Sequence, residues 1–394
     1  MSVKKPSRQA TFALICLATL VSLAECAQAQ RNLVYVESNI GSIPSMNSVL
    51  GYSNDGTGQL TPLAGSPYLT KGTGVYSPTD HTPFLADGQV TVNPEGTLLF
   101  AVNGHTNSIA VFQIGADGSL TPVAGSPFAS GGRQPASLSF GDNLLPNNTS
   151  LLTVVNKDSD STQSAGNPSY KVFQVTAGGT LTTVPNSLIS LPSGSSPGQA
   201  LIRKNGKLIF TLEFLLPAIT SHVFQGKGVM AQVSQLNPPI SGADPLGEAL
   251  HPTQRVLYVG LPTVNQLAVY TYDLAGNLTF VETVPNSGDA ICWMVVNQAG
   301  TRLYTAESES KSVSVYDLTV ATAPVMIQHL ILSSSGGPTN VALDPTGKFL
   351  YVIAAANLHV LNVAADGSLT ETLNPLALPV PAGEFPLGLA TLSK

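Results

Sequence analysis

The sequence predicts an all-β protein that folds as a seven-bladed β-propeller with four antiparallel strands in each blade. Three observations predict this fold. The chain is poor in charged residues and rich in turn residues, a unit of four short strands recurs along it, and its last strand has no partner nearby in sequence. Four strands repeating at an interval of about 45–55 residues are typical of propeller blades.

The composition excludes several other classes of protein. Only 10% of the 394 residues are charged, whereas an average soluble domain has about 25%. Glycine and proline contribute 36 and 29 residues, and 43% of the chain is hydrophobic. A helical bundle would need more charge on its outer faces, and a disordered chain would need less apolar surface. A net charge of -6 also argues against nucleic acid as a partner.

The repeat unit is clearest in residues 90–123, where three apolar runs are followed by an Asp-Gly turn and the run Leu-Thr-Pro-Val. Its first turn recurs at Gly206, Gln254, Gly300 and Gly347, in steps of 254 - 206 = 48, 300 - 254 = 46 and 347 - 300 = 47 residues. Asp-Gly favours hairpins because glycine adopts positive φ without strain. First strands are therefore expected near Val90, Ala136, Ala200, Leu246, Val295, Val341 and Leu387.

The first run after the leader, residues 33–36, reads as a second strand, so the strand near Leu387 should complete the first blade and close the ring. Longer loops are expected at residues 65–88, 142–148, 158–169 and 215–227. No linker or second domain is predicted.

The first residues have the pattern of a secretory leader. Lys4, Lys5 and Arg8 precede a mostly apolar run over residues 10–23, and Ala27-Gln28-Ala29 supplies a small-residue cleavage site. The run is too short to span a membrane comfortably. We expect residues 1–29 to be removed and residues 30–394 to form one exported propeller, periplasmic or extracellular and monomeric. Cys292 is then the one cysteine left, so no disulfide within the chain is expected.

The repeat also indicates where a site could lie. In propellers of this kind the loops after second strands and before first strands meet on one face. Each second strand has an aromatic residue, or Thr153 in its place, and the position three residues further on should lie at the channel mouth on that face. These seven positions are Ser38, Asn103, Asn156, Glu213, Leu261, Glu307 and Ala354. Loops nearby add Asp80, His81, His105, Arg133, Lys157, Asp158, His222 and Glu309.

These residue types suggest acid–base chemistry. Glu213, His105 or His222 could act as the catalytic acid or base, and Arg133 or Lys157 could stabilise an oxyanion. Binding roles are expected for Asn103, Asn156, Lys157, Glu307, Asp80 and His81. The alternative is that such strand-end side chains only satisfy turn backbone.

No cofactor is predicted, and no zinc or EF-hand spacing is present. Calcium on Glu213, Asn103 and Asn156 is chemically plausible because hard oxygen ligands suit that ion.

Residues 344–352 (DPTGKFLYV) and 108–120 (SIAVFQIGADGSL) resemble the lactonase family of seven-bladed propellers, which includes 6-phosphogluconolactonase and the fungal carboxymuconate-cyclising enzymes. The resemblance covers nearly all of residues 31–394, but non-catalytic YVTN-type propellers share these motifs. It implies hydrolysis of a sugar-type lactone.

The family's catalytic signatures are mostly replaced. Pro-His-x-His becomes Pro135-Ala136-Ser137-Leu138, Gly-Pro-Arg-His becomes Ser196-Pro197-Gly198-Gln199, and an expected arginine becomes Glu307. Of Asn-Glu-Leu, only Glu213 is retained. Two hypotheses follow: a lactonase-like hydrolase, or a binding propeller without catalysis that recognises a glycan or a protein.

Overall fold

The computed structural model describes residues 1–3, 31–164, 166–204, 206–333 and 336–394. The fold described below is that of Arg31–Lys394. The predicted leader, with Cys16 and Cys26, lies outside the described residues apart from its first three. Within the described part, no helix is long and apolar enough to cross a membrane.

The described strands form seven antiparallel sheets, which confirms the predicted seven-bladed propeller. We number the blades in chain order. Blade 1 consists of β1 (Asn32–Glu37), β2 (Ser48–Asn54), β3 (Leu60–Pro62), β4 (Tyr68–Leu69) and β32 (Leu387–Ser393). Blade 2 consists of β5 (Val90–Val92), β6 (Leu98–Asn103), β7 (Ser108–Ile114), β8 (Leu120–Pro122) and β9 (Phe128–Ala129). Blade 3 consists of β10 (Pro135–Leu145), β11 (Thr149–Asn156), β12 (Ser169–Val175), β13 (Leu181–Thr183) and β14 (Ile189–Ser190).

Blade 4 consists of β15 (Pro197–Ile202), β16 (Leu208–Glu213), β17 (Ala218–Gln225) and β18 (Val229–Leu236), and blade 5 of β19 (Glu248–Leu250), β20 (Val256–Leu261), β21 (Gln266–Tyr272) and β22 (Leu278–Pro285). Blade 6 consists of β23 (Ile291–Val296), β24 (Arg302–Glu307), β25 (Ser312–Asp317) and β26 (Val325–Ile331). Blade 7 consists of β27 (Pro338–Leu343), β28 (Phe349–Ala354), β29 (Asn357–Val363), β30 (Leu369–Thr370) and β31 (Leu376–Ala377). Three short 3-10 helices, η1 (Thr82–Phe84), η2 (Pro146–Asn148) and η3 (Pro262–Val264), lie in connections.

The second strand of each blade is the most apolar because a neighbouring blade covers each of its faces. All six residues of β6 are buried, as are those of β20 and β28. By contrast, the fourth strand β22 has several exposed residues because it lies at the rim. Buried apolar clusters therefore form between adjacent blades, such as the one that joins Phe100 of β6 to Phe173 of β12.

Tyrosines of the second strands connect neighbouring blades. The hydroxyl of Tyr35 donates to the carbonyl of Gly118 in the next blade at 2.8 Å, and Tyr304 donates to that of Gly367 at 3.1 Å. Both acceptors are glycines of the Asp-Gly hairpins found in the sequence. The recurrence of tyrosine and Asp-Gly thus reflects one repeated contact between blades.

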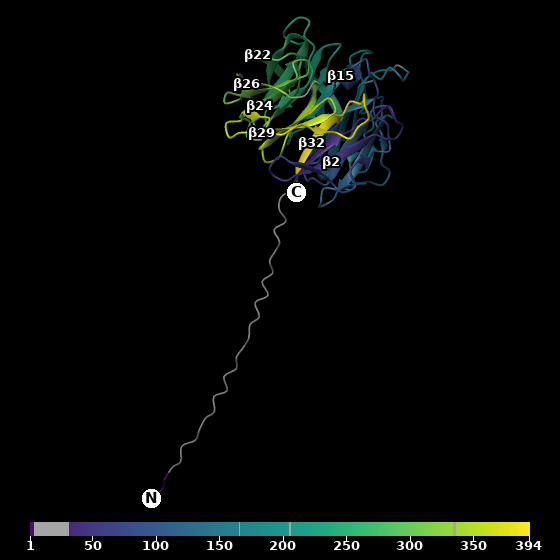
Figure 1. Cartoon of the computed structure of the whole chain (residues 1–394). Coiled ribbons are helices and arrows are strands. Elements are labelled where there is room, and N and C mark those ends of the chain that lie inside the picture. Colours follow the sequence, from purple (N-terminus) through teal and green to yellow (C-terminus); the bar gives the residue numbers. More distant parts are fainter. Residues whose placement is uncertain (4–30, 165, 205, 334–335) are drawn as a thin grey trace. The chain divides into compact units, whose positions relative to one another are not determined.

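The ring is closed by β32, which pairs with β1 in blade 1, as the sequence predicts. Tyr35 lies opposite Ala390, and the backbone of Arg31 and Lys394 exchanges hydrogen bonds of 2.6 and 2.9 Å. Figure 1 shows the yellow β32 beside the purple strands of blade 1. β32 thus covers the edge of β1 that would otherwise face the channel.

The loop expected at residues 142–148 is shorter than predicted, because β10 extends to Leu145. The loop expected at residues 215–227 is wrong. Residues 215–227 were expected to form an insertion, but residues 218–225 form the regular strand β17, paired along its length with β16 and β18. The run Ala-Ile-Thr-Ser-His-Val-Phe-Gln contains no glycine or proline, and its alternating residues fit a pleated sheet.

Two glycines with the same backbone conformation offer a test of blade packing. Gly247 has φ +72°, and a Cβ atom there would overlap the carbonyl oxygen of Cys292, whereas Gly347 has φ +71° and open space where its Cβ would lie. We expect Gly247→Ala to cost about 4 kcal/mol of unfolding free energy and Gly347→Ala about 1 kcal/mol, because only the first adds a backbone clash to the strain of positive φ. Denaturant unfolding followed by the fluorescence of the single tryptophan, Trp293, measures both. Equal costs for the two variants would contradict the close approach of Gly247 to the backbone of Cys292.

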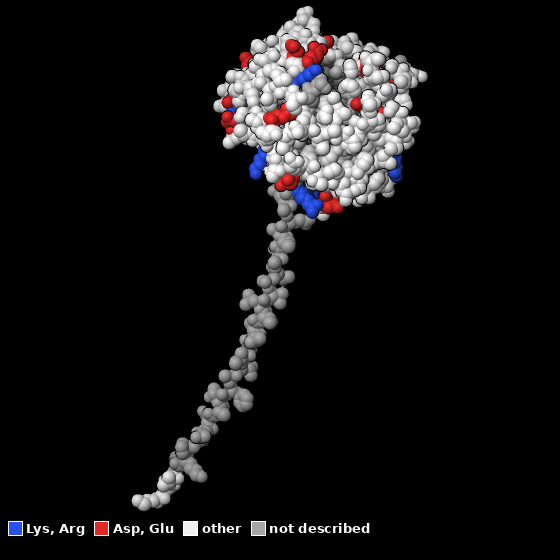
Figure 2. All heavy atoms as spheres, viewed as in Figure 1, with Lys and Arg blue, Asp and Glu red and all other residues white. Residues whose placement is uncertain are grey.

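The surface in view in Figure 2 is mostly uncharged, with the Lys, Arg, Asp and Glu side chains in small separate groups. This matches the low charge content of the sequence.

Candidate functional site

Residues 82–88, which we call the strap, lie across one end of the channel. They contact first strands on opposite sides of the ring: the backbone N–H of Asp87 donates to Gly198 O of β15 at 3.1 Å, and the Asp87 side-chain oxygen Oδ1 accepts from Asn340 Nδ2 of β27 at 2.6 Å. Phe84 stacks on Phe385, with ring centres 4.9 Å apart. The expected channel mouth is therefore covered by the chain's own backbone.

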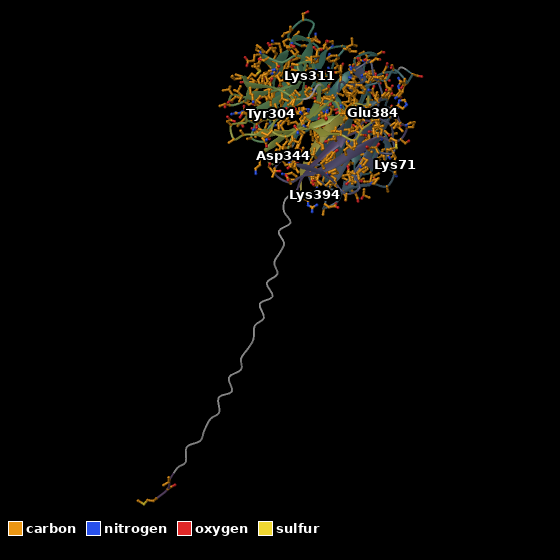
Figure 3. All side chains as sticks on the ribbon, in the orientation of Figure 1. Lys71, Tyr304, Lys311, Asp344, Glu384 and Lys394 are labelled. Carbon is orange, nitrogen blue, oxygen red and sulfur yellow. The ribbon has the colours of Figure 1, made fainter. Side chains whose placement is uncertain are left out.

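The loop that leads into β32 supports the strap from outside. Glu384, labelled in Figure 3, accepts hydrogen bonds from the backbone N–H groups of Gly41 and Ser42, each at 3.0 Å. This fixes the segment that carries Phe385. Asp80 and His81 precede the strap: Asp80 Oδ1 accepts from Thr82 N at 2.9 Å, and the His81 ring lies 5.1 Å from that of Phe385. Both residues thus contact the strap itself.

An open hollow lies elsewhere on the propeller. Its volume is about 1300 Å³, and it is lined mainly by turns of blades 6 and 7, including Asn297, Asp344 and Asp366, together with Lys204 of blade 4. These turns join first to second and third to fourth strands, so the hollow is on the face opposite the strap. It contains none of the predicted site residues.

Asn103, Asn156 and Glu307 occupy equivalent buried positions at the ends of second strands. Each contacts the hydroxyl of the first residue of the third strand: Asn103 donates to Ser108 at 3.1 Å, Asn156 to Ser169 at 3.5 Å, and Glu307 accepts from Ser312 at 2.8 Å. A glycine packs over each of the three, namely Gly72, Gly132 and Gly288. The equivalent positions of these three residues in the sequence repeat therefore reflect a contact that recurs within the blades.

Glu213 differs because its blade lacks that hydroxyl. Its third strand begins with Ala218, which lies opposite Glu213 in the register. Glu213 instead accepts from the hydroxyl of Tyr170 in blade 3, at 3.5 Å. Burial raises the pKa of this carboxyl, and the Tyr170 hydrogen bond offsets part of the shift. Glu213 is only partly buried, so it remains accessible.

His222, expected on a loop, lies inside β17 and is buried between blades. Its Nε2 is 3.2 Å from Thr211 Oγ1, and its ring lies edge-on to Tyr170. Burial lowers the pKa of the ring to about 4. The strand places His222 in the packing between blades 3 and 4 rather than on the face that carries the strap.

This burial makes His222 a source of acid sensitivity. Since its pKa is about 6.5 in the unfolded chain and about 4 in the folded one, the unfolded state binds the proton first as the pH falls. We expect the wild type to lose about 3 kcal/mol more unfolding free energy than His222→Gln between pH 7.5 and pH 4. Denaturant titrations of both proteins across this range measure it. Parallel curves would mean that the ring protonates without cost in the folded protein.

Lys157 is fully buried and fixes the strap to blade 4. Its ammonium donates to Leu85 O at 2.8 Å, to Ser196 Oγ at 2.7 Å, and at longer distance to the carbonyls of Ser196 and Pro197. Burial lowers its pKa to about 7. Its hydrogen-bonding capacity is used within the protein.

His105 and Asp160 form a hydrogen-bonded pair, and Asp160 follows Lys157 closely in the sequence. His105 Nδ1 lies 2.8 Å from Asp160 Oδ2, and the His105 side chain is 43% exposed. Burial acts to raise the pKa of Asp160, but hydrogen bonds from Thr162, Gln163 and His105 outweigh it, so this pKa is lowered. A neutral His105 that donates Nδ1–H to Asp160 has its Nε2 lone pair free to accept a proton.

Arg133 belongs to the same group of loops. Its guanidinium lies 2.7 Å from Asp158 Oδ1. Asn107 links the loops, because it donates to Gln163 Oε1 at 2.8 Å and accepts from Gln134 N at 2.7 Å. The structure thus places His105 and Arg133 on one hydrogen-bonded network, whereas Glu213 stands on blade 4 and His222 is enclosed.

The sequence analysis missed Asp160, Tyr170 and the strap. Asp160 lies in a loop that was expected, but no local pattern pairs it with His105, 55 residues earlier. Among the residues that the structure describes, no group of three or more His, Cys, Asp and Glu side chains could hold a metal ion.

Comparison with known proteins agrees with this architecture. The fold defines the chain as a seven-bladed β-propeller. Residues 162–326 match the family model described as Lactonase, 7-bladed beta-propeller. No curated protein sequence matches it.

Solved structures with the same fold include proteins described as lactonases. The periplasmic gluconolactonase of Pseudomonas aeruginosa is 16% identical, with a TM-score of 0.71 over 92% of this chain and 99% of that one. A proposed 6-phosphogluconolactonase from Bacteroides uniformis is 14% identical, with a TM-score of 0.70 over 93% and 100% of the two chains. At these identities the likeness is one of fold.

Proposed function

We propose that this propeller hydrolyses a lactone at the His105–Asp160 pair. The observation that carries the proposal is a half-exposed histidine whose Nδ1 is 2.8 Å from a carboxylate, since this arrangement leaves Nε2 directed away from its partner as a general base. The family match and the resemblance to gluconolactonases supply the reaction class.

The reaction needs one base and one water molecule. His105 Nε2 takes a proton from water as the water oxygen bonds to the lactone carbonyl carbon. The ring C–O bond then breaks, and the proton passes from His105 to the departing alkoxide, which gives a hydroxy acid. Arg133, on the same loop network, is the cation available for the developing oxyanion.

The test is a hydrolysis screen with neutral and phosphorylated sugar lactones on the mature protein and on His105→Gln. Turnover by the wild type that falls by about 100-fold or more in the variant supports the proposal. Turnover that is equal in the two proteins excludes His105 as the base. Glu213→Gln in the same screen reports whether the accessible carboxylate contributes instead.

A second candidate is a binding propeller without catalysis, recognising a glycan or a protein. The strap favours it, because residues 82–88 cover the channel mouth and the hydrogen bonds of the Lys157 ammonium are all made to protein groups there. This candidate predicts no turnover of any lactone by the wild type, together with retention of the protein on a glycan array or by a partner protein.

We also propose that the propeller is exported and acts as a monomer. The leader pattern of residues 1–29 supports export, and one relative is described as periplasmic. Cell fractionation of the full chain, with mass spectrometry of the new N-terminus, tests it. Retention of residues 1–29 on a cytosolic protein would refute export, and light scattering of the mature protein reports its oligomeric state.

A further inference from the structure

The open hollow on the face opposite the strap is large enough to hold an extended ligand. Its volume is about 1300 Å³, whereas pockets for small ligands measure about 300–1000 Å³. Tyr304 and Asp344, both labelled in Figure 3, belong to its lining. Three cations and two carboxylates also line it, namely Lys204, Arg302, Lys348, Asp344 and Asp366.

Two of these cations are free. Lys204 of blade 4 and Lys348 of blade 7 are exposed, and their ammonium groups have no hydrogen bond or ion pair with any residue that the structure describes. Arg302, by contrast, is held in place, because its Nε donates to Asp366 O at 2.8 Å and its Nη1 to Thr301 O at 2.6 Å. The hollow therefore combines one fixed guanidinium with two unpaired ammonium groups.

The carboxylates beside these cations are already bound within the protein. Asp344 is 3% exposed, and its Oδ1 accepts from two backbone N–H groups of its own turn at 2.7 and 3.0 Å. Asp366 accepts from the backbone and the hydroxyl of Ser368. Asp317, at the end of β25, lies 3.2 Å from Arg302. The charge left for a ligand is therefore positive.

The cations follow the blade repeat. Each of blades 4 to 7 has at least one cation at the turn between its first and second strands, and we call this set the basic arc: Lys204, Lys207, Arg255, Arg302 and Lys348. The corresponding turns of blades 2 and 3 have Glu95 and Asp142 instead. The positive charge is thus confined to one half of the ring, and it extends over four adjacent blades.

The remaining lining favours a sugar chain as the anionic ligand. Exposed amide and hydroxyl groups such as those of Gln298 and Thr319 can donate to and accept from sugar hydroxyls. The aliphatic side chains of Val295, Leu343 and Val363 are partly buried and can pack against the C–H face of a sugar ring. An acidic peptide would satisfy the ammonium groups but would bring few hydroxyls to this lining.

We propose that the hollow binds a uronate oligosaccharide, with carboxylates at the ammonium groups of Lys204 and Lys348 and hydroxyls against the turns of blades 6 and 7. The site is separate from the His105–Asp160 pair, because it lies on the face opposite the strap. Binding there would attach the propeller to an acidic polysaccharide and leave the face with the strap open to solvent.

The test is calorimetric titration of the mature protein with hexagalacturonate, and with maltohexaose as the uncharged probe. We expect only hexagalacturonate to bind, with an affinity that falls as salt is added, because the ammonium groups are exposed. In the double variant Lys204→Gln/Lys348→Gln the affinity should fall by about 10-fold or more.

The matched control is Lys71→Gln/Lys311→Gln. It removes the same charge from two other exposed lysines, both labelled in Figure 3, and should bind hexagalacturonate as the wild type does. His105→Gln should also bind it normally, so the result does not depend on whether the protein hydrolyses a lactone.

Four outcomes would overturn the proposal. The first is no binding of hexagalacturonate by the wild type, and the second is equal binding of maltohexaose. The third is an unchanged affinity in the Lys204→Gln/Lys348→Gln variant, which would place the ligand elsewhere. The fourth is equal or tighter binding of a polyglutamate peptide or a single-stranded oligonucleotide, which would assign the basic arc to a different class of polyanion.

Discussion

Asp160→Asn is expected to lower kcat for lactone hydrolysis by about 10²–10⁴-fold while leaving the fold intact. The effect comes from the histidine tautomer rather than from lost packing, because aspartate and asparagine have nearly the same shape. Steady-state kinetics on the lactone found in the screen, with circular dichroism of both proteins, measures it.

The hydrogen bonds of Asp160 determine which way the asparagine amide would face. Its Oδ1 accepts from the backbone N–H of Thr162 at 3.0 Å, and this donor cannot become an acceptor. The other oxygen, Oδ2, accepts from Gln163 Nε2 at 3.0 Å, but that donor belongs to a side chain that can turn away. The fixed backbone donor therefore keeps the amide oxygen at the Thr162 side, and the NH₂ group faces His105 Nδ1. His105 would then carry its proton on Nε2, and the lone pair needed for catalysis would be lost.

A matched control is Asp142→Asn, the same change in blade 3 at the hairpin between β10 and β11. Asp142 accepts from Ser150 Oγ at 2.8 Å and has no contact with His105. It should leave kcat unchanged. An Asp160→Asn enzyme with full activity would show that the pair only holds the loop, and it would favour the binding function.

The second large effect is a pH dependence caused by Lys157. Its pKa is about 7 in the folded protein and about 10.4 in the unfolded chain, so between these values the unfolded state binds more protons. Stability from this group therefore rises with pH above 7. Relative to Lys157→Met, the wild type should gain about 2 kcal/mol of unfolding free energy between pH 7 and pH 9.

Comparison with the variant removes the contributions of the other titrating groups. Lys171→Met serves as the control, because Lys171 is only partly buried and should give a curve closer to that of the wild type. If the wild type and Lys157→Met differ by a constant amount at all pH values, the Lys157 ammonium stays charged in the folded protein and burial does not destabilise it.

The architecture could be predicted because it repeats. Seven first strands, the hairpins and the closure by the strand near Leu387 all follow from short patterns that depend on neighbouring residues. The error at residues 218–225 has a local cause: the repeat there lacks the Asp-Gly hairpin that identified other blades. His222 was therefore assigned to a loop although it lies in a strand.

The candidate site was harder to predict because its contacts are long-range. The phase of Asn103, Asn156 and Glu307 was evident in the sequence, but their bonds to third-strand hydroxyls are set by register. Nothing local shows that residues 82–88 cross the channel to reach Gly198 and Asn340, 111 and 253 residues from Asp87. The expected loops near His105 and Arg133 do meet, although the partner of His105 required the fold.

The pairing of β1 with β32 has a consequence for how the molecule is made. The strand that completes blade 1 is synthesised after every other described strand, so blades 2 to 7 can pack while the first blade still has an open edge. Contacts of such high sequence separation form slowly. Until β32 docks, the nascent propeller is an open arc, and the unpaired edge of β1 is the surface on which a chaperone or a second chain could act.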